Sequence, residues 1–196
     1  MDKLQEIIEK LGLEGQLPLD EIPSIDLYMD QVIQLFEKKF AETKRTPDEK
    51  VLTKTMINNY AKGKLLFPIK NKKYSKEHLI LISLIYQLKG ALSINDIKMA
   101  LSGINEKVEQ GSVKLDEFYS SYLQIIGENT GSFIEMVQQQ GKRINEQTEV
   151  LKKASDADLF EPVLMIASFV HMSNLYRRVA EKLVDQLQEK HESNGH

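Results

Sequence analysis

TKTMINNYAKGKLLFPIKNKKYS, residues 53–75, is the stretch that predicts a short helix followed by a basic hairpin. Thr53 is placed to cap the helix, because its hydroxyl can accept a hydrogen bond from a backbone amide two or three residues later. Gly63 suits the left-handed conformation in which many helices end. We therefore expect a helix over residues 53–62, with one apolar stripe made of Met56, Ile57 and Tyr60.

The residues after that glycine predict a wing. Two leucines are expected to pack onto the core beneath the helix, and Phe67 and Pro68 then open an extended arm. The arm, residues 69–70, leads through a turn at residues 71–72 to a return strand at residues 73–74. Two short strands around a polar tip make a wing.

Positive charge is concentrated in the same stretch. Between Lys50 and His78 there are eight lysines and one glutamate, so this segment carries +7 in a chain of net charge -3, and the other residues together carry -10. A cation concentration this local in an acidic protein favours a docking face for a polyanion. The alternative is an ordinary solvated surface, which is what most charge clusters are.

The same pattern continues as a series of characteristic residues over about residues 51–102. It runs through a short helix, Tyr60, Gly63, Leu65-Leu66, Pro68, the basic hairpin, Tyr74, a polar cap, a helix with Leu79 and Leu84, Gly90, Ser93-Ile94, Asp96-Ile97 and Leu101. This order resembles the winged helix-turn-helix of MerR-type transcription regulators. The whole chain is also similar to an uncharacterised bacterial family known only for a MerR-like amino-terminal region. MerR proteins usually carry arginines before the tyrosine and in the wing, where this chain has Asn58-Asn59 and lysines.

The resemblance implies that the protein binds double-stranded DNA, with the helix of residues 53–62 in the major groove and the wing of residues 67–74 on the flanking backbone. An asparagine amide offers the donor and acceptor that an adenine edge requires, so Asn58 and Asn59 are either base contacts or ordinary polar surface residues. Lysines of the wing would contact phosphates, which adds affinity without sequence information. Tyr74 is either a phosphate ligand or a core anchor. The candidate DNA-binding residues are Lys54, Thr55, Asn58, Asn59, Lys62, Lys64, Lys70, Asn71, Lys72, Lys73 and Tyr74.

The rest of the chain predicts a mostly helical fold. Residues 1–22 read as an amino-terminal helix and a linker, and residues 23–104 as the MerR-like DNA-binding domain. In that domain a helix begins near Asp26 and is either the first helix of the helix-turn-helix or a support for it. After the wing, a helix that is apolar on several sides should be buried on more than one. Ser93 and Asp96 then form a capping-box variant at the start of the next helix.

Residues 105–190 predict a helical region for dimerisation or for sensing an effector, followed by a tail at residues 191–196. Its long amphipathic stretches, the second from about Asp158 to about Lys190, carry more apolar surface than one helical hairpin buries. The excess predicts an interface, either within the chain or with a second copy. The resemblance implies a homodimer built by a carboxyl-terminal coil. Aromatic residues in this region could line a pocket for a small effector, or they could simply be core.

Several classes of function lack the residues they need. There are no cysteines, so disulfides and thiolate metal sites are excluded. The four histidines are scattered, and there is no phosphate-cradling loop or nucleophile elbow. We therefore expect no enzymatic activity, no cofactor and no metal. The amino terminus is amphipathic and has no long apolar run, so we expect a cytoplasmic protein without a membrane partner.

Together these observations predict a mostly α-helical protein with a winged helix-turn-helix and a carboxyl-terminal helical hairpin, acting as a DNA-binding transcription regulator. The alternative is a non-enzymatic interaction module that keeps the winged fold and binds an acidic protein surface.

Overall fold

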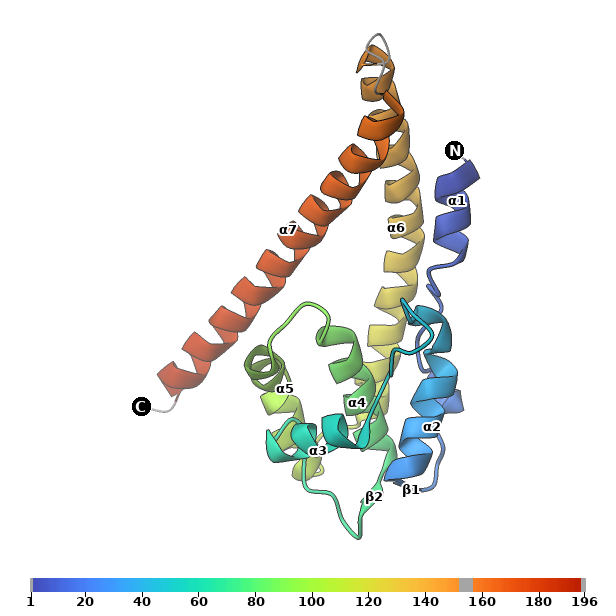
Figure 1. Ribbon diagram of the computed structural model, residues 1–196. Helices are drawn as coiled ribbons and strands as arrows, with labels where there is room; N and C mark the ends of the chain where they lie inside the picture. The colour runs from blue at the N-terminus through green and yellow to red at the C-terminus, as the bar shows by residue number, and fades with distance from the viewer. Residues whose placement is uncertain (1, 152–156, 195–196) are drawn as a thin grey trace.

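The computed structural model describes residues 2–151 and 157–194. Over these residues the protein is mostly helical with one two-stranded antiparallel sheet (Figure 1), which confirms the predicted fold class. The helices are α1 (Asp2–Glu9), α2 (Met29–Lys39), α3 (Lys54–Lys62), α4 (Lys76–Leu88), α5 (Ile94–Glu109), α6 (Leu115–Leu151) and α7 (Ala157–Asn194). The strands are β1 (Leu27–Tyr28) and β2 (Lys73–Tyr74), and the 3-10 helices are η1 (Leu19–Glu21) and η2 (Ala41–Thr43).

Helix α4 is the centre of the core. Every residue from His78 to Ile85 is buried, so the helix is enclosed on all sides, as its apolar sequence predicts. Strand β2, α5 and α6 pack directly against it. Tyr119 of α6 is fully buried; its hydroxyl donates to the Leu17 carbonyl at 2.8 Å and lies 3.0 Å from the Ser83 hydroxyl. This one side chain therefore joins α6, α4 and the amino-terminal linker.

The sheet joins the wing to the segment before α2. Strands β1 and β2 pair antiparallel, with Leu27 opposite Tyr74. The sequence predicted helix from about Asp26, and that boundary is wrong: α2 begins at Met29, because backbone pairing with the wing and burial of Leu27 favour a strand before it. The two arms of the wing pair with each other only by a bridge between Lys70 and Lys73.

Residues 40–53 connect α2 to α3, and Glu37 holds this connection in place. Its carboxylate accepts a hydrogen bond from the Val51 amide at 2.8 Å and pairs with the Lys44 ammonium. The Lys44 side chain is the main reason why the pKa of Glu37 is lowered. The connection is much longer than the three or four residues of a simple helix-turn-helix. The position of α3 therefore depends on these contacts and on its own buried face.

The end of α3 differs from the expected one. Gly63 has φ -73°, and Lys64 takes the left-handed conformation with φ 59°. The Leu65 amide donates to the Tyr60 carbonyl at 2.9 Å and the Lys64 amide to the Ala61 carbonyl at 3.1 Å, which is the Schellman pattern. A Cβ at Gly63 would lie 2.8 Å from Cδ1 of the buried Leu65. At position 63 a larger residue would thus push on Leu65, whereas φ itself does not call for glycine.

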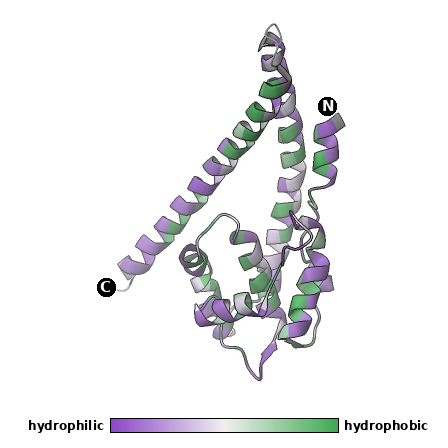
Figure 2. Ribbon diagram, in the orientation of Figure 1, coloured by the Kyte–Doolittle hydropathy of each residue, from purple (hydrophilic) through white to green (hydrophobic). Residues whose placement is uncertain are grey.

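Helices α6 and α7 form an antiparallel hairpin, and α7 then diverges from α6 toward α5, which it contacts (Figure 1). Helix α7 begins at Ala157, close to the predicted start near Asp158, and Pro162 lies inside it. The helix also continues to Asn194, so residues 191–194 of the expected tail are helical, and residues 195–196 lie outside the described residues. Hydropathy colouring shows apolar and polar residues mixed along α7, whereas the middle of α4 is mainly apolar (Figure 2).

Replacing Lys64 by glycine should stabilise the protein by about 0.5–1 kcal/mol. A non-glycine residue in the left-handed region destabilises the folded state by about 1–2 kcal/mol, and glycine relieves this strain. Glycine also increases the conformational entropy of the unfolded chain, which offsets about 0.4–1 kcal/mol of that gain. The matched control is Lys62→Gly, two residues earlier in the last turn of the helix, which should destabilise by about 0.5–1 kcal/mol. Urea unfolding of the three proteins measures both changes. Destabilisation by both substitutions would show that Lys64 is not strained.

Candidate nucleic-acid interface

Helix α3 has one face in the core and one in solvent. The Thr53 hydroxyl accepts a hydrogen bond from the Met56 amide at 3.2 Å, which confirms the predicted cap. Ile57 and Tyr60 are buried, and burial raises the pKa of the Tyr60 hydroxyl. The opposite face is exposed and carries the side chains of Lys54, Thr55, Asn58, Asn59 and Lys62. The five predicted groove-facing residues of this helix therefore share one accessible surface.

The tip of the wing is a tight turn. The Lys73 amide donates to the Lys70 carbonyl at 3.0 Å, and the two residues between them, Asn71 and Lys72, have φ 53° and 58°. Positive φ at both central positions defines a type I′ turn, which is the tight turn that matches the twist of a hairpin. Lys70, Asn71 and Lys72 are all exposed. The tip thus presents two exposed ammonium groups from three successive residues.

Some of the predicted contact residues already interact with other residues of the chain. Tyr74 is only 3% exposed, so its assignment as a DNA-binding residue is wrong, and it anchors β2 in the core. Lys73 is half-buried, with its ammonium 5.2 Å from the centre of the Tyr28 ring. Lys54 pairs with Asp30 at 2.7 Å, although both groups remain well exposed.

Four predicted lysines stay exposed without a carboxylate within ion-pair distance in the described part of the chain: Lys62, Lys64, Lys70 and Lys72. Two of them, Lys64 and Lys72, are in the left-handed conformation. Glycine would be less strained at both positions. The chain therefore keeps two ammonium groups on this surface where backbone conformation alone favours glycine.

His78 fixes the base of the wing, a role that the sequence did not reveal. Its ring stacks on Phe67 with centroids 3.8 Å apart and meets Tyr74 edge-on at 5.9 Å. The Ser75 amide donates to Nδ1 at 3.1 Å. Nδ1 is thus the acceptor of the neutral ring, and Nε2 donates to the Phe67 carbonyl at 3.2 Å. Both ends of the hairpin, at Phe67 and Tyr74, therefore contact one side chain at the start of α4.

Asn105 is the second positioning residue that sequence reasoning missed. It lies on α5, is 9% exposed, and its amide donates to the Leu65 carbonyl at 2.9 Å and to the Leu101 carbonyl at 3.2 Å. The bond to Leu65 attaches α5 to the turn that follows α3. The available signal in the sequence was its spacing: Asn105 follows Leu101 by four residues, so it lies on the same buried face of the helix.

The described residues 17–122 match a family model, Domain of unknown function (DUF1836). The chain belongs to this DUF1836 family. The match includes the sheet, α2 to α5 and the first turns of α6, whereas α1 and α7 lie outside it. The lysine surface, formed by Lys62, Lys64, Lys70 and Lys72, therefore lies wholly within the family domain. No curated protein and no solved structure matches the chain.

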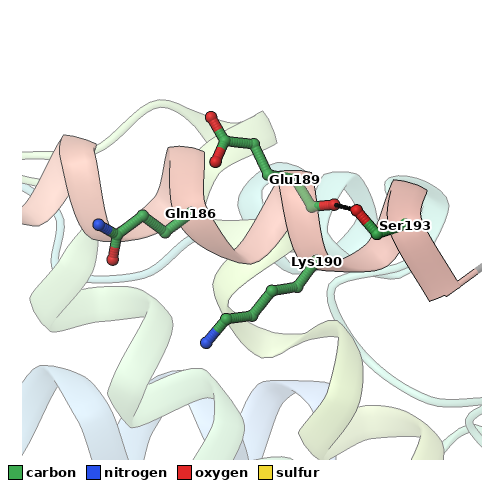
Figure 3. Close-up of a pocket in the computed structure, with 4 residues that line it drawn as sticks. All are labelled: Gln186, Glu189, Lys190 and Ser193. Atoms are coloured by element: carbon green, nitrogen blue, oxygen red, sulfur yellow. Dashed lines mark hydrogen bonds between the residues drawn. The ribbon is translucent and has the colours of Figure 1, made fainter.

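Other sites are sparse in the part of the DUF1836 chain that the structure describes. No group of three or more histidine, aspartate or glutamate side chains there could hold a metal ion. A hollow beside the last turns of α7 is lined by Gln186, Glu189, Lys190 and Ser193, all from one helix. Figure 3 shows the Glu189 carboxylate and the Lys190 ammonium pointing away from each other, so these side chains do not converge on a ligand. In the same described residues, no helix is both long enough and apolar enough to span a membrane.

Acid should weaken the wing of this DUF1836 protein through His78. Burial, opposed by the Phe67 carbonyl and by the charges of Glu77 and Asp26, lowers the pKa of His78 below its ordinary value of 6.5. The unfolded chain therefore binds the proton at a higher pH than the folded one, so the contribution of neutral His78 is complete above about pH 7.5 and is lost as the pH falls through 6.5. Urea unfolding at pH 7.5 and 5.5 measures the loss.

The control for this measurement is His78→Gln, which removes the titrating ring. The variant should be less stable at pH 7.5, because the ring stacking is gone, and it should lose less stability than the wild type between the two pH values. Equal losses in the two proteins would assign the acid sensitivity to carboxylates elsewhere.

Proposed function

We propose that this protein is a DNA-binding transcription regulator of the MerR-like winged type, acting in the cytoplasm. The exposed face of α3 would enter the major groove, and the wing tip would contact the backbone of the flanking duplex. The element order supports this proposal, because α3, the wing, α4 and α5 follow one another as they do in the pattern that the sequence resembles. The proposed activity is binding, without a chemical step.

The observation that carries the proposal is the retention of lysine at strained positions. Lys64 and Lys72 both have positive φ, and each is exposed without an intramolecular carboxylate in the described residues. A lysine that served only solubility would not need to occupy a position with a strained backbone. A phosphate ligand would compensate for the strain, because a charge-assisted contact to phosphate adds affinity wherever the ammonium is held.

Asn58 and Asn59 supply the candidate base contacts. Both side chains are exposed on the face of α3 that also carries Lys62. Asparagine can form two hydrogen bonds with the major-groove edge of adenine. The lysines would set affinity, and the asparagines would set sequence preference.

A second candidate function is docking of an acidic protein surface on the same face. Carboxylates of this chain already bind two lysines of the basic stretch, Lys54 through Asp30 at 2.7 Å and Lys76 through Asp116 at 2.8 Å. Carboxylates of a partner could bind the remaining lysines in the same way. Salt dependence separates the two functions, because duplex DNA releases about 0.9 counterions per neutralised phosphate.

Helix α7 supports action as a homodimer. Leu159, Val163, Ile166 and Val170 are spaced by four, three and four residues, and each is more than half exposed. A second exposed apolar stripe, made of Tyr176, Val179, Leu183 and Leu187, lies on a different side of the helix, because six residues separate Val170 from Tyr176. An exposed apolar stripe at this spacing is typical of a coiled-coil seam, and monomers rarely leave so much apolar surface in solvent. A dimer would present two α3 helices and favour a near-palindromic DNA site.

Changing Lys70 and Lys72 together to glutamate should abolish binding to a short random-sequence duplex. The substitution reverses two unpaired charges at the wing tip, and exposed positions of this kind should change the unfolding free energy by no more than about 1 kcal/mol. Fluorescence anisotropy at several salt concentrations measures the affinity, and the wild-type slope of log affinity against log salt gives the number of phosphates contacted.

The matched control for the wing substitution is Lys182→Glu with Lys190→Glu, which makes the same change in net charge on α7. It should retain most of the duplex binding. Equal losses of affinity in the two double variants would show that only net charge matters. If neither the wild type nor the control binds the duplex, docking of an acidic protein becomes the better account of this surface.

Introducing glutamate at Val179 and Leu183 should convert a dimer into a monomer of 22.5 kDa. These side chains are 61% and 57% exposed in the single chain, so the change should disrupt the seam without unfolding the protomer. Light scattering measures the mass, and circular dichroism measures the helix content. The control is Arg178→Glu with Lys182→Glu, at the same spacing on the polar side of α7, which should remain dimeric. A monomeric wild type would remove the dimer from the proposal.

A further inference from the structure

A cavity of about 690 Å³ lies between α1, α6 and α7. All of its lining residues lie outside residues 17–122, so it belongs neither to the family domain nor to the lysine surface. Its volume is within the range of about 300–1,000 Å³ typical of small-molecule sites. The cavity is therefore a separate feature of this chain, and its chemistry can be considered independently of DNA binding.

The three helices that form the cavity have a defined register. The Gln138 amide of α6 donates to Gln5 of α1 at 3.1 Å, and a Cβ at Gly141 would lie 2.7 Å from Cδ2 of Leu4. The Gln140 amide of α6 donates to the Ser168 hydroxyl of α7 at 2.8 Å. Residue numbers therefore rise toward the hairpin tip along α6 and fall toward it along α1 and α7, as Figure 1 also shows.

This register gives the cavity a polar end and an apolar end. Toward the hairpin tip it is lined by Lys3, Lys142, Asn145 and Glu161. Farther from the tip the lining residues Ile7, Ile166 and Phe169 are apolar, and the polar residue of that end, Gln138, is already hydrogen-bonded to Gln5. A ligand that fits both ends has a charged head and an apolar body.

The polar end holds groups that have no partner in the described residues. No ion pair or hydrogen bond involves the side chains of Lys3, Lys142 or Glu161 there. The side-chain oxygen of Asn145 is buried and accepts no hydrogen bond. Such an unsatisfied acceptor is costly, and the amide torsion of asparagine is soft enough to turn the oxygen toward a donor in the cavity. Lys3 and Lys142 are exposed at the rim, so the groups available to a head group are two ammonium donors, one carboxylate and one amide acceptor.

We propose that this cavity binds an α-amino acid with a large apolar side chain. The ligand carboxylate would accept hydrogen bonds from Lys3 and Lys142, and the ligand ammonium would donate to Glu161 and to the Asn145 oxygen. The ligand side chain would lie against Ile7 and Phe169. A simple anionic amphiphile would bring a second negative charge beside Glu161, and a simple amine would leave both lysines unpaired. A zwitterionic head uses all four groups.

Three related probes test this assignment by isothermal titration calorimetry on the full chain: L-phenylalanine, 3-phenylpropanoate, which lacks the ammonium, and 2-phenylethylamine, which lacks the carboxylate. L-Phenylalanine should bind roughly 10- to 100-fold more tightly than either analogue, the range expected for losing charge-assisted hydrogen bonds. No binding of L-phenylalanine up to about 10 mM, or equal affinity for all three probes, would overturn the proposal.

Substitutions then assign each half of the head group. Glu161→Gln should reduce the preference for L-phenylalanine over 3-phenylpropanoate to within about threefold, and Lys3→Gln with Lys142→Gln should do the same for the preference over 2-phenylethylamine. Arg143→Gln, at the next position of α6 and outside the lining, should leave both preferences unchanged. Unaltered preferences in the cavity variants would place the binding site elsewhere. The wild-type comparison of the three probes stands even where a variant fails to fold.

Discussion

The enclosure of α4 is the constraint on which the rest of the structure depends. A helix buried from His78 to Ile85 needs neighbours on every side, and it recruits them from segments far apart in the chain. The wing is attached to its start through His78, and α6 is attached farther along through Tyr119 and Ser83. The apolar surface of one helix thus determines where both the basic hairpin and the long carboxyl-terminal helices lie.

The basic surface shows how local strain and charge compete. At the end of α3 and at the wing tip the backbone takes conformations that suit glycine, yet lysine occupies positions 64 and 72. Rigid surroundings hold these conformations: the Schellman hydrogen bonds and the Asn105 amide at one place, and the type I′ turn backed by β1 at the other. A strained residue persists where the surrounding structure over-determines it, and such residues concentrate at functional sites.

The candidate binding surfaces of the chain lie in two separate regions. The lysine surface lies in the DUF1836 domain, whereas the cavity and the apolar stripe of α7 lie outside residues 17–122. Helix α6 belongs to both regions, because its first turns pack on α4 and its last turns line the cavity. A ligand bound in the cavity would therefore contact α6, and α6 is packed on the core beneath the lysine surface.

Much of this architecture follows from sequence because it rests on local rules. The caps at Thr53 and Ser93 and the turn at residues 71–72 depend on neighbouring residues alone, and the apolar sequence of α4 shows that this helix must be buried even though its partners come from elsewhere in the chain. The strand at Leu27 and the left-handed Lys64 could not be predicted, because each is decided by groups distant in sequence or by a contact with the core. The same is true of His78 and Asn105, whose partners are backbone carbonyls of other elements. For Tyr74 the sequence left two roles open, phosphate ligand or core anchor, and its burial decides for the core.

By itself, the sequence determined the order of helices, the position of the wing and the gathering of lysines between residues 50 and 78, since periodicity, capping residues and charge are properties of short segments. Only the tertiary structure decided which lysines are free, which tyrosine is buried and which charged groups meet around a cavity. Those outcomes depend on side chains brought together across more than a hundred residues, and no local pattern encodes such distances.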